Sequence, residues 1–284
     1  MPKHISKETK ESLVKEYQER PITIGEISER YGISKPSVGK ILSQYRIKPW
    51  SREKLFSPDL IEDYFERVDT QEKAYYLGLI TTDGCVFWKN RKSAFLSIEL
   101  KKKDGYILEQ FMRTIGCNRK LVYSQRSDTL TATVTSTKMV RDLEKYAIHP
   151  RSSLTQQFWT DVPSEYLASY LRGVVDGDGS FGFYSRPGRS VHKKLLRICS
   201  GSPVFLECLL HKVRSMLPIS MPRIQTDTEK NCHMFGWARN DDLETIITFL
   251  YSTDGPFLIR KKEIADRILS EIRQYRDNGH KAAS

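Results

Sequence analysis

Two short segments of the 284-residue sequence place an acidic residue beside glycine in the same apolar context. They are Tyr76-Leu-Gly-Leu-Ile-Thr-Thr-Asp83-Gly84 and Leu171-Arg-Gly-Val-Val-Asp-Gly-Asp178-Gly179. A single Asp-Gly most often only starts a tight turn. Two in matching surroundings favour a paired site, because carboxylates brought together repel each other unless a cation neutralises them. Mg²⁺ prefers such oxygen ligands, so the pair predicts a magnesium site at Asp83 and Asp178.

Each aspartate closes a stretch that reads as a helix, and the helices are expected at residues 72–82 and 164–177. Gly78 and Thr82 are four positions apart, as are Gly173 and Gly177, so each helix carries small side chains along one face. Such faces allow two helix backbones to approach closely, which would bring the two aspartates together. The glycine after each aspartate suits the left-handed conformation that often ends a helix.

The segments after the two motifs repeat the same order of elements. In the first, strands are expected at 85–88, 94–100, 120–124 and 131–135, and helices at 106–115 and 138–146. In the second, strands are expected at 180–184, 195–200, 223–226 and 233–238, and helices at 204–217 and 242–251. An internal repeat of this kind predicts an α+β fold with two pseudo-symmetric αββαββα halves.

The N-terminal segment reads as three short helices at residues 7–20, 24–31 and 35–45. Thr23 and Glu26 have capping-box spacing, and Gly32 ends the second helix. The segment Glu26-Ile-Ser-Glu-Arg-Tyr-Gly-Ile-Ser-Lys-Pro-Ser-Val resembles the helix-turn-helix of bacterial and phage DNA-binding proteins. The expected DNA-contacting residues of the third helix are Lys35, Ser37, Lys40, Ser43 and Gln44. The alternative is a three-helix packing module whose polar face is only solvated.

These elements divide the chain into five parts. We expect a helix-turn-helix domain at 1–48, a linker at 49–69, a first half at 70–155, a second half at 156–276 and a disordered tail at 277–284.

The composition favours a polyanionic partner and argues against a membrane protein. Lys+Arg number 46 against 35 Asp+Glu, a formal net charge of +11. No apolar run is long enough for a membrane helix, and the N-terminus lacks the apolar core of a signal peptide. The five cysteines form no Cys-x-x-Cys pair, which argues against a disulfide framework or a zinc finger. We therefore expect a cytoplasmic protein, encoded by a bacterium or a phage.

The paired motifs resemble the two signature motifs of the single-chain LAGLIDADG homing endonucleases, and the resemblance covers about residues 70–275. It implies that each half contributes a saddle-shaped four-stranded sheet lying along the DNA major groove. It also implies that Asp83 and Asp178 are catalytic and hold the divalent metals, with help from the backbone carbonyls of Thr82 and Gly177. The first motif departs from the family pattern at Thr81, where an aspartate often stands.

The same resemblance assigns a basic residue to each half. Leu258-Ile-Arg-Lys-Lys262 resembles the segment that supplies the catalytic lysine, which would be Lys261. In the first half, Ser152 stands about where that lysine is expected. Basic residues in the hairpin turns and nearby segments are candidate DNA contacts, with a solvated edge as the alternative: Lys89, Arg91, Lys92, Lys101, Arg151, Arg186 and Arg189.

These observations predict a monomeric, site-specific endonuclease that hydrolyses phosphodiesters of double-stranded DNA with Mg²⁺, for which Mn²⁺ would substitute. Two alternatives stay open. A catalytically inactive transcription regulator on the same fold is favoured by Thr81 and Ser152 but disfavoured by the two aspartates. An intron RNA splicing maturase is disfavoured by the helix-turn-helix.

Overall fold

The computed structural model describes residues 5–50, 52–90, 93–150, 155–185 and 192–282. The chain divides into two compact units, Met1–Ile61 with Met112–Lys120 and Glu62–Phe111 with Leu121–Ser284. Among the described residues, no helix is both long and apolar enough to cross a membrane. Several residues considered above lie outside the described ranges: Arg91, Lys92, Arg151, Ser152, Arg186 and Arg189.

The first unit begins with the three predicted helices. They are α1 (Lys7–Glu19), α2 (Ile24–Tyr31) and α3 (Lys35–Gln44), and a short α4 (Arg52–Phe56) follows. The Thr23–Glu26 capping box forms as predicted, with the Glu26 N–H donating to Thr23 Oγ1 at 3.0 Å. Gly32 ends α2 at a φ of 61°, in the left-handed region that favours glycine. The three predicted helices and the turn at Gly32 are therefore present, and they enclose a core that contains Leu13, Tyr17, Ile27, Val38 and Leu42.

The linker expected at residues 49–69 is instead largely folded. Trp50 packs against the three-helix core, and its indole Nε1–H donates to the Tyr17 carbonyl at 2.8 Å. Within the second unit, Phe65 is fully buried and its ring stacks near that of Phe111, with centroids 6.3 Å apart. These aromatic side chains bury apolar area that a flexible linker would leave in water, and the boundary between the two units, Ile61 to Glu62, lies within this segment.

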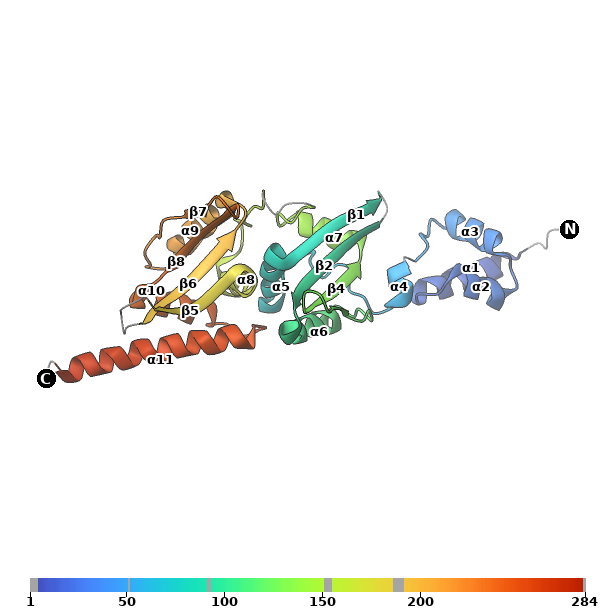
Figure 1. The fold of residues 1–284 in the computed structure, drawn as a ribbon. Helices are drawn as coiled ribbons and strands as arrows, with labels where there is room; N and C mark the ends of the chain where they lie inside the picture. The colour runs from blue at the N-terminus through green and yellow to red at the C-terminus, as the bar shows by residue number, and fades with distance from the viewer. Residues whose placement is uncertain (1–4, 51, 91–92, 151–154, 186–191, 283–284) are drawn as a thin grey trace. The chain divides into compact units, whose positions relative to one another are not determined.

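The second unit contains the predicted repeat (Figure 1). Its first half is α5 (Gln71–Asp83), β1 (Gly84–Asn90), β2 (Ser93–Lys101), the 3₁₀ turn η1 (Lys102–Asp104), α6 (Gly105–Thr114), β3 (Val122–Ser124), β4 (Thr129–Thr135) and α7 (Thr137–Glu144). Its second half is α8 (Ser164–Asp178), β5 (Gly179–Ser185), β6 (His192–Ser200), α9 (Pro203–Met216), β7 (Gln225–Asp227), β8 (Cys232–Trp237), α10 (Asn240–Leu250) and α11 (Ile259–Ala282). The two antiparallel sheets have equivalent orders, β1-β2-β4-β3 and β5-β6-β8-β7. The predicted α+β fold with two αββαββα halves is confirmed.

Side chains of the central strands alternate between a buried face and a face without helix cover. Leu96 and Ile98 of β2 are buried, as are Leu196 and Ile198 of β6. We call the opposite side of each sheet its open face. It carries the odd-numbered residues of β1, β2 and β4 in the first sheet, and the odd-numbered residues of β6 with the even-numbered residues of β5 and β8 in the second.

Helices α5 and α8 pack directly on each other between the two sheets (Figure 1). A Cβ atom at Gly78 would lie 2.0 Å from the Tyr170 carbonyl oxygen, and one at Gly173 would lie 2.1 Å from the Tyr75 carbonyl oxygen. At Gly177 it would lie 1.9 Å from Thr82 Oγ1. The predicted small-residue face is confirmed, because only glycine leaves room for this helix contact.

The glycines after the two aspartates differ from the expectation. Gly84 and Gly179 have φ values of −88° and −89°, which are extended and not left-handed. Each strand begins at once from its helix, and a Cβ atom at Gly84 would lie 2.3 Å from the Ile80 carbonyl oxygen. Glycine is required here by the tight passage from helix to strand.

The tail expected to be disordered from residue 277 is part of a helix, since α11 runs from Ile259 to Ala282. The helix was not anticipated over this length. Its buried residues Ala265, Ile268 and Ile272 recur at helical spacing, so one face of α11 packs on the second half. This packing stabilises the helix.

The contact between α5 and α8 generates a stability prediction. Gly173→Ala should lower the free energy of unfolding by about 3 kcal/mol or more, because the backbone carbonyl of Tyr75 cannot move aside without separating the helices. Urea unfolding followed by circular dichroism measures this change. Gly39→Ala is the matched control, since a Cβ atom there meets nothing within 4 Å. Equal stability of the two variants would contradict the tight helix contact.

Candidate active site

Asp83 and Asp178 end the two packed helices and lie beside each other's helix end. A Cβ atom built on Gly177 would be 2.8 Å from Asp83 Oδ2, so the Asp83 carboxylate reaches the last turn of α8. Burial and the nearby Asp178 carboxylate raise the pKa of Asp83 to about 7. Burial also raises the pKa of Asp178 to about 6, against the opposing effect of the Lys261 ammonium. The structure thus brings the two predicted aspartates together at a position where their charges are unfavourable.

The Lys261 side chain packs against the end of α8 and is only 5% exposed. Its Nζ donates to the carbonyl oxygens of Val175 at 2.7 Å, Asp176 at 2.5 Å and Gly179 at 2.7 Å, and lies 3.2 Å from that of Gly177. The ammonium therefore binds carbonyls of the last turn of α8 and of the first residue of β5, where the negative end of the helix dipole favours a cation. Burial lowers the pKa of Lys261 to about 8, although neighbouring carboxylates oppose this effect.

Arg172, inside the second motif, organises the loop that leads to Lys261. Its side chain is 1% exposed, and its guanidinium donates to four carbonyl oxygens, one at the end of α10 and three in the loop between α10 and α11. The acceptors are Leu250, Thr253, Asp254 and Pro256, at 2.8–3.0 Å. A guanidinium supplies five N–H donors in a fixed fork, so this one side chain holds the loop in a single shape. The sequence signal was a cation within an apolar helix.

Asp176 occupies the first acidic position of the second motif and is 1% exposed. Its Oδ2 accepts from the Tyr75 hydroxyl at 2.9 Å and from the Leu258 N–H at 2.8 Å, which ties the loop before α11 to both motif helices. Its Oδ1 is buried without a hydrogen-bond partner, and burial raises the pKa of Asp176 to about 6. The corresponding Thr81 of the first motif donates back to the Leu77 carbonyl of its own helix at 2.8 Å, and its Oγ1 lies 3.4 Å from the Tyr170 hydroxyl of α8.

A pocket of about 410 Å³ opens beside Asp83. Arg260 Nε donates to both carboxylate oxygens of the buried Asp104, at 2.9 and 3.1 Å, and so joins the start of α11 to η1 of the first half. The pocket is lined by four acidic and two basic residues together with Leu100, Thr129 and Gly177: Asp83, Glu99, Asp104, Asp176, Lys101 and Arg260. Sequence reasoning singled out Asp83, Lys101 and Gly177 of this set.

The donor set at the helix ends fits a hard divalent cation. Two desolvated carboxylates lie near each other, and the Gly177 carbonyl belongs to the last turn of α8, beside them. Across the described ranges, no group of three or more His, Cys, Asp or Glu side chains could hold a metal ion. Such a cation would therefore need ligands from backbone carbonyls, water or phosphate, which is the usual situation for Mg²⁺.

The other predicted site residues are placed as follows. In the first unit, Lys35, Lys40 and Gln44 are exposed on α3, while Ser37 bonds Ser34 Oγ through its own hydroxyl at 2.9 Å. In the second unit, Lys89 is exposed near the end of β1.

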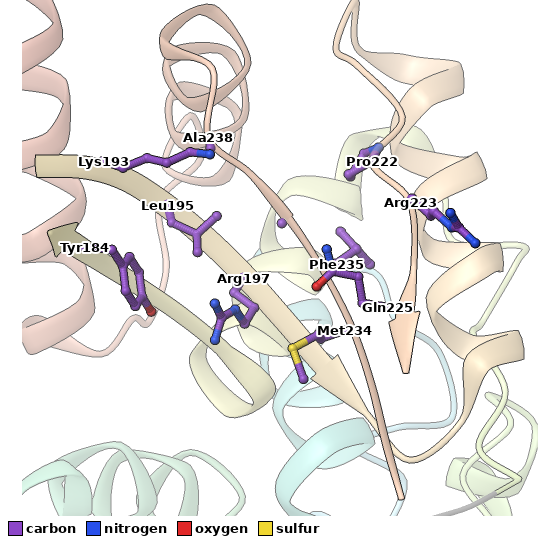
Figure 2. Close-up of a pocket in the computed structure, with 11 residues that line it drawn as sticks. Tyr184, Lys193, Leu195, Arg197, Pro222, Arg223, Gln225, Met234, Phe235 and Ala238 are labelled. Carbon is purple, nitrogen blue, oxygen red and sulfur yellow. The ribbon is translucent and has the colours of Figure 1, made fainter. Parts of the chain in front are cut away.

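The open face of the second sheet holds polar residues that sequence reasoning did not select. A pocket of about 380 Å³ lies over this sheet, and Figure 2 shows Tyr184, Lys193, Arg197 and Gln225 among its lining residues. Arg197 lies between the buried Leu196 and Ile198 on the same strand, so its side chain belongs to the other face of the sheet. Period-two patterning of the sequence could have identified it.

Comparison with known proteins gives matches at the level of structure. No protein-family model matches the sequence, and no curated protein matches it significantly. The structure is similar to the I-LtrWI LAGLIDADG homing endonuclease bound to target DNA, with a TM-score of 0.54, 13% identity, and coverage of 77% of this chain and 93% of that chain. It is also similar to the LAGLIDADG meganuclease I-AabMI bound to uncleaved DNA, with a TM-score of 0.54, 13% identity, and coverage of 72% and 92%.

A third similar structure is the I-SmaMI LAGLIDADG homing endonuclease bound to cleaved DNA, with a TM-score of 0.52, 15% identity, and coverage of 73% of this chain and 90% of that chain. At these identities the likeness concerns the fold. Together with the paired motif helices and the two equivalent sheets, it shows that this chain has the LAGLIDADG homing endonuclease fold, with both motifs in one polypeptide.

Proposed function

We propose that this chain is a monomeric, site-specific endonuclease that cleaves double-stranded DNA with Mg²⁺ held at Asp83 and Asp178. The observation that carries the proposal is the meeting of these two carboxylates at the ends of α5 and α8, where burial makes their charges costly. A cation that neutralises them gives a physical reason for the arrangement. The fold similarity to nucleases bound to DNA and the net charge of +11 support a nucleic-acid substrate.

The chain's own groups would divide the work at this site. Asp83 and Asp178 would hold the cation with the carbonyls of Thr82 and Gly177. When bound, Mg²⁺ supplies Lewis-acid stabilisation of the negative charge that develops on phosphate oxygens. Lys261 acts in this proposal as a positioning residue, because its ammonium is directed at the carbonyls that end α8. It also places a positive charge close to Asp178.

The helix-turn-helix unit would add affinity through α3. Lys35 and Lys40 are exposed there, and Gln44 lies one turn further along the helix. Cations and amides of this kind contact phosphates and base edges when a recognition helix lies in the major groove. The exposed lysines of the second unit, such as Lys89, would contact phosphates.

Asp178→Asn tests the nuclease proposal directly. The variant should bind duplex DNA nearly as well as the wild type but lose cleavage in Mg²⁺ by at least roughly 100-fold, because the amide cannot replace the carboxylate as a cation ligand. Electrophoresis of duplex DNA that carries the insertion junction of the gene, with and without Mg²⁺, measures both properties. Cutting retained by the variant would reject the role of Asp178. Binding without cutting by the wild type would favour the inactive regulator.

Asp83→Asn tests metal binding without DNA. At pH 8 in EDTA the variant should melt higher than the wild type by roughly 3–6 °C, because it removes one of two facing carboxylates. Addition of Mg²⁺ should raise the melting temperature of the wild type and leave that of the variant nearly unchanged. The control Glu109→Gln removes an exposed charge on α6 and should behave as the wild type. An equal Mg²⁺ response in Asp83→Asn would argue against the site.

Lys40→Ala tests the helix-turn-helix in the full-length chain. Loss of one phosphate contact should weaken binding to all duplex sequences and reduce the slope of log affinity against log salt by about 0.9. Fluorescence anisotropy over a salt series measures the slope. Lys15→Ala, an exposed lysine on α1, is the control and should leave the slope unchanged. Identical slopes for the two variants would mean that α3 does not contact DNA.

A further inference from the structure

We propose that the two halves select different bases: the open face of the first sheet reads a thymine-rich half-site, and that of the second sheet reads a half-site containing guanine. This inference rests on the proposed function and concerns the base composition of its substrate. It follows from a chemical difference between two sheets whose topology and register are otherwise equivalent.

The central part of the first sheet's open face is apolar or hydroxylic. Phe87 is 42% exposed, and its ring stacks on that of Phe95 with centroids 4.9 Å apart and an interplanar angle of 8°. Register pairing places Ser97 against Thr133, and Phe95 against Thr135. The charged residues of this face in β2, Glu99 and Lys101, line the pocket beside Asp83, so they belong to the candidate active site.

The central part of the second sheet's open face is cationic and hollow. Arg197 lies with its guanidinium carbon 5.4 Å from the centroid of the Tyr184 ring, and Figure 2 shows both side chains on the same side of the sheet. Arg197 pairs with Gly236, which has no side chain to fill the pocket of about 380 Å³. Lys193, Arg223 and Gln225 complete its polar lining.

Equivalent register positions show the contrast most clearly. Cys85, two residues after Asp83, pairs with Ser97, while Ser180, two residues after Asp178, pairs with Arg197. Two residues further along each strand, on the same face, Phe87 pairs with Phe95, whereas Gly182 pairs with Leu195. The same place on the two sheets thus carries a small hydroxyl in one half and a guanidinium in the other, and a stacked aromatic pair in one half and a glycine in the other.

These side chains match different features of the DNA major groove. Phenylalanine rings and threonine methyl groups make apolar contacts with the thymine methyl, and they offer no strong partner for the guanine acceptors. A guanidinium donates two hydrogen bonds to guanine O6 and N7, which is the commonest specific contact in this groove. Glutamine pairs with adenine, so Gln225 on the edge strand β7 of the same sheet fits a purine in the half-site that contains this guanine.

Selection of bound duplexes from a pool with a randomised core, using the full-length chain in Ca²⁺, tests the inference. The enriched site should have one half rich in thymine and the other containing guanine near the centre. In the selected duplex, deoxyuridine removes only the thymine methyl and should weaken binding about four-fold per contacted base. 7-Deazaguanine removes only the N7 acceptor and should weaken binding about ten-fold at the base read by Arg197.

Two variants assign each half-site to a sheet. Phe87→Ser should abolish the deoxyuridine effect at the thymine that Phe87 contacts and leave the 7-deazaguanine effect intact, and Arg197→Ser should do the reverse. Tyr275→Ser removes an aromatic side chain that is 72% exposed on α11, and as the control it should retain both effects. Melting temperatures of the variants establish that each is folded before binding is compared.

The outcomes separate this inference from the proposed function. A selected duplex that is cut in Mg²⁺ but has similar base composition in both halves, or a deoxyuridine effect that survives Phe87→Ser, would overturn the half-site inference alone. Failure to enrich any sequence, together with no cutting of duplex DNA, would overturn the proposed function and this inference with it.

Discussion

The approach of α5 to α8 through Gly78 and Gly173 is the contact on which the second unit depends. Backbone lies against backbone at these positions, since a Cβ atom on either glycine would collide with a carbonyl oxygen of the facing helix. The helices consequently end side by side, and each passes directly into the first strand of its own sheet. One packing constraint therefore places two carboxylates together and sets two sheets on either side of them (Figure 1).

The helix ends accumulate negative charge, and the surrounding structure compensates part of it. Carbonyl groups without partners and two aspartates lie at the same end of the helix pair, where the helix dipoles are negative. The Lys261 ammonium neutralises some of this charge at the end of α8. Arg172 and Asp176 bind the loop that precedes α11 and so position Lys261. The first half has a different arrangement, in which the neutral Thr81 hydroxyl contacts the Leu77 carbonyl and the Tyr170 hydroxyl, and Arg260 from α11 binds Asp104. The pseudo-symmetry of the fold thus does not extend to the chemistry around the two aspartates.

Packing constraints explain why two sheets of equivalent topology have different open faces. Residues on the covered face must fill a core, so both sheets keep buried apolar side chains there. Residues on the open face are free of that constraint and differ between the halves, with Phe87 and Phe95 in one and Arg197 in the other. A chain with two different faces suits an asymmetric ligand, whereas a symmetric dimer would present the same face twice.

The sequence alone determined the repeat, the order of the elements and the pairing of Asp83 with Asp178. Apolar periodicity and glycine spacing are local properties, so they could be read without coordinates. It misjudged features that depend on distant partners: the burial of Phe65 against Phe111, the extended conformation of Gly84, and the length of α11. Only the tertiary structure decided that Lys261 caps α8, that Arg172 holds the α10–α11 loop, and that Asp176 joins both motif helices. These contacts link residues far apart in the chain, and they become necessary only when packing buries polar groups of the helix ends away from water.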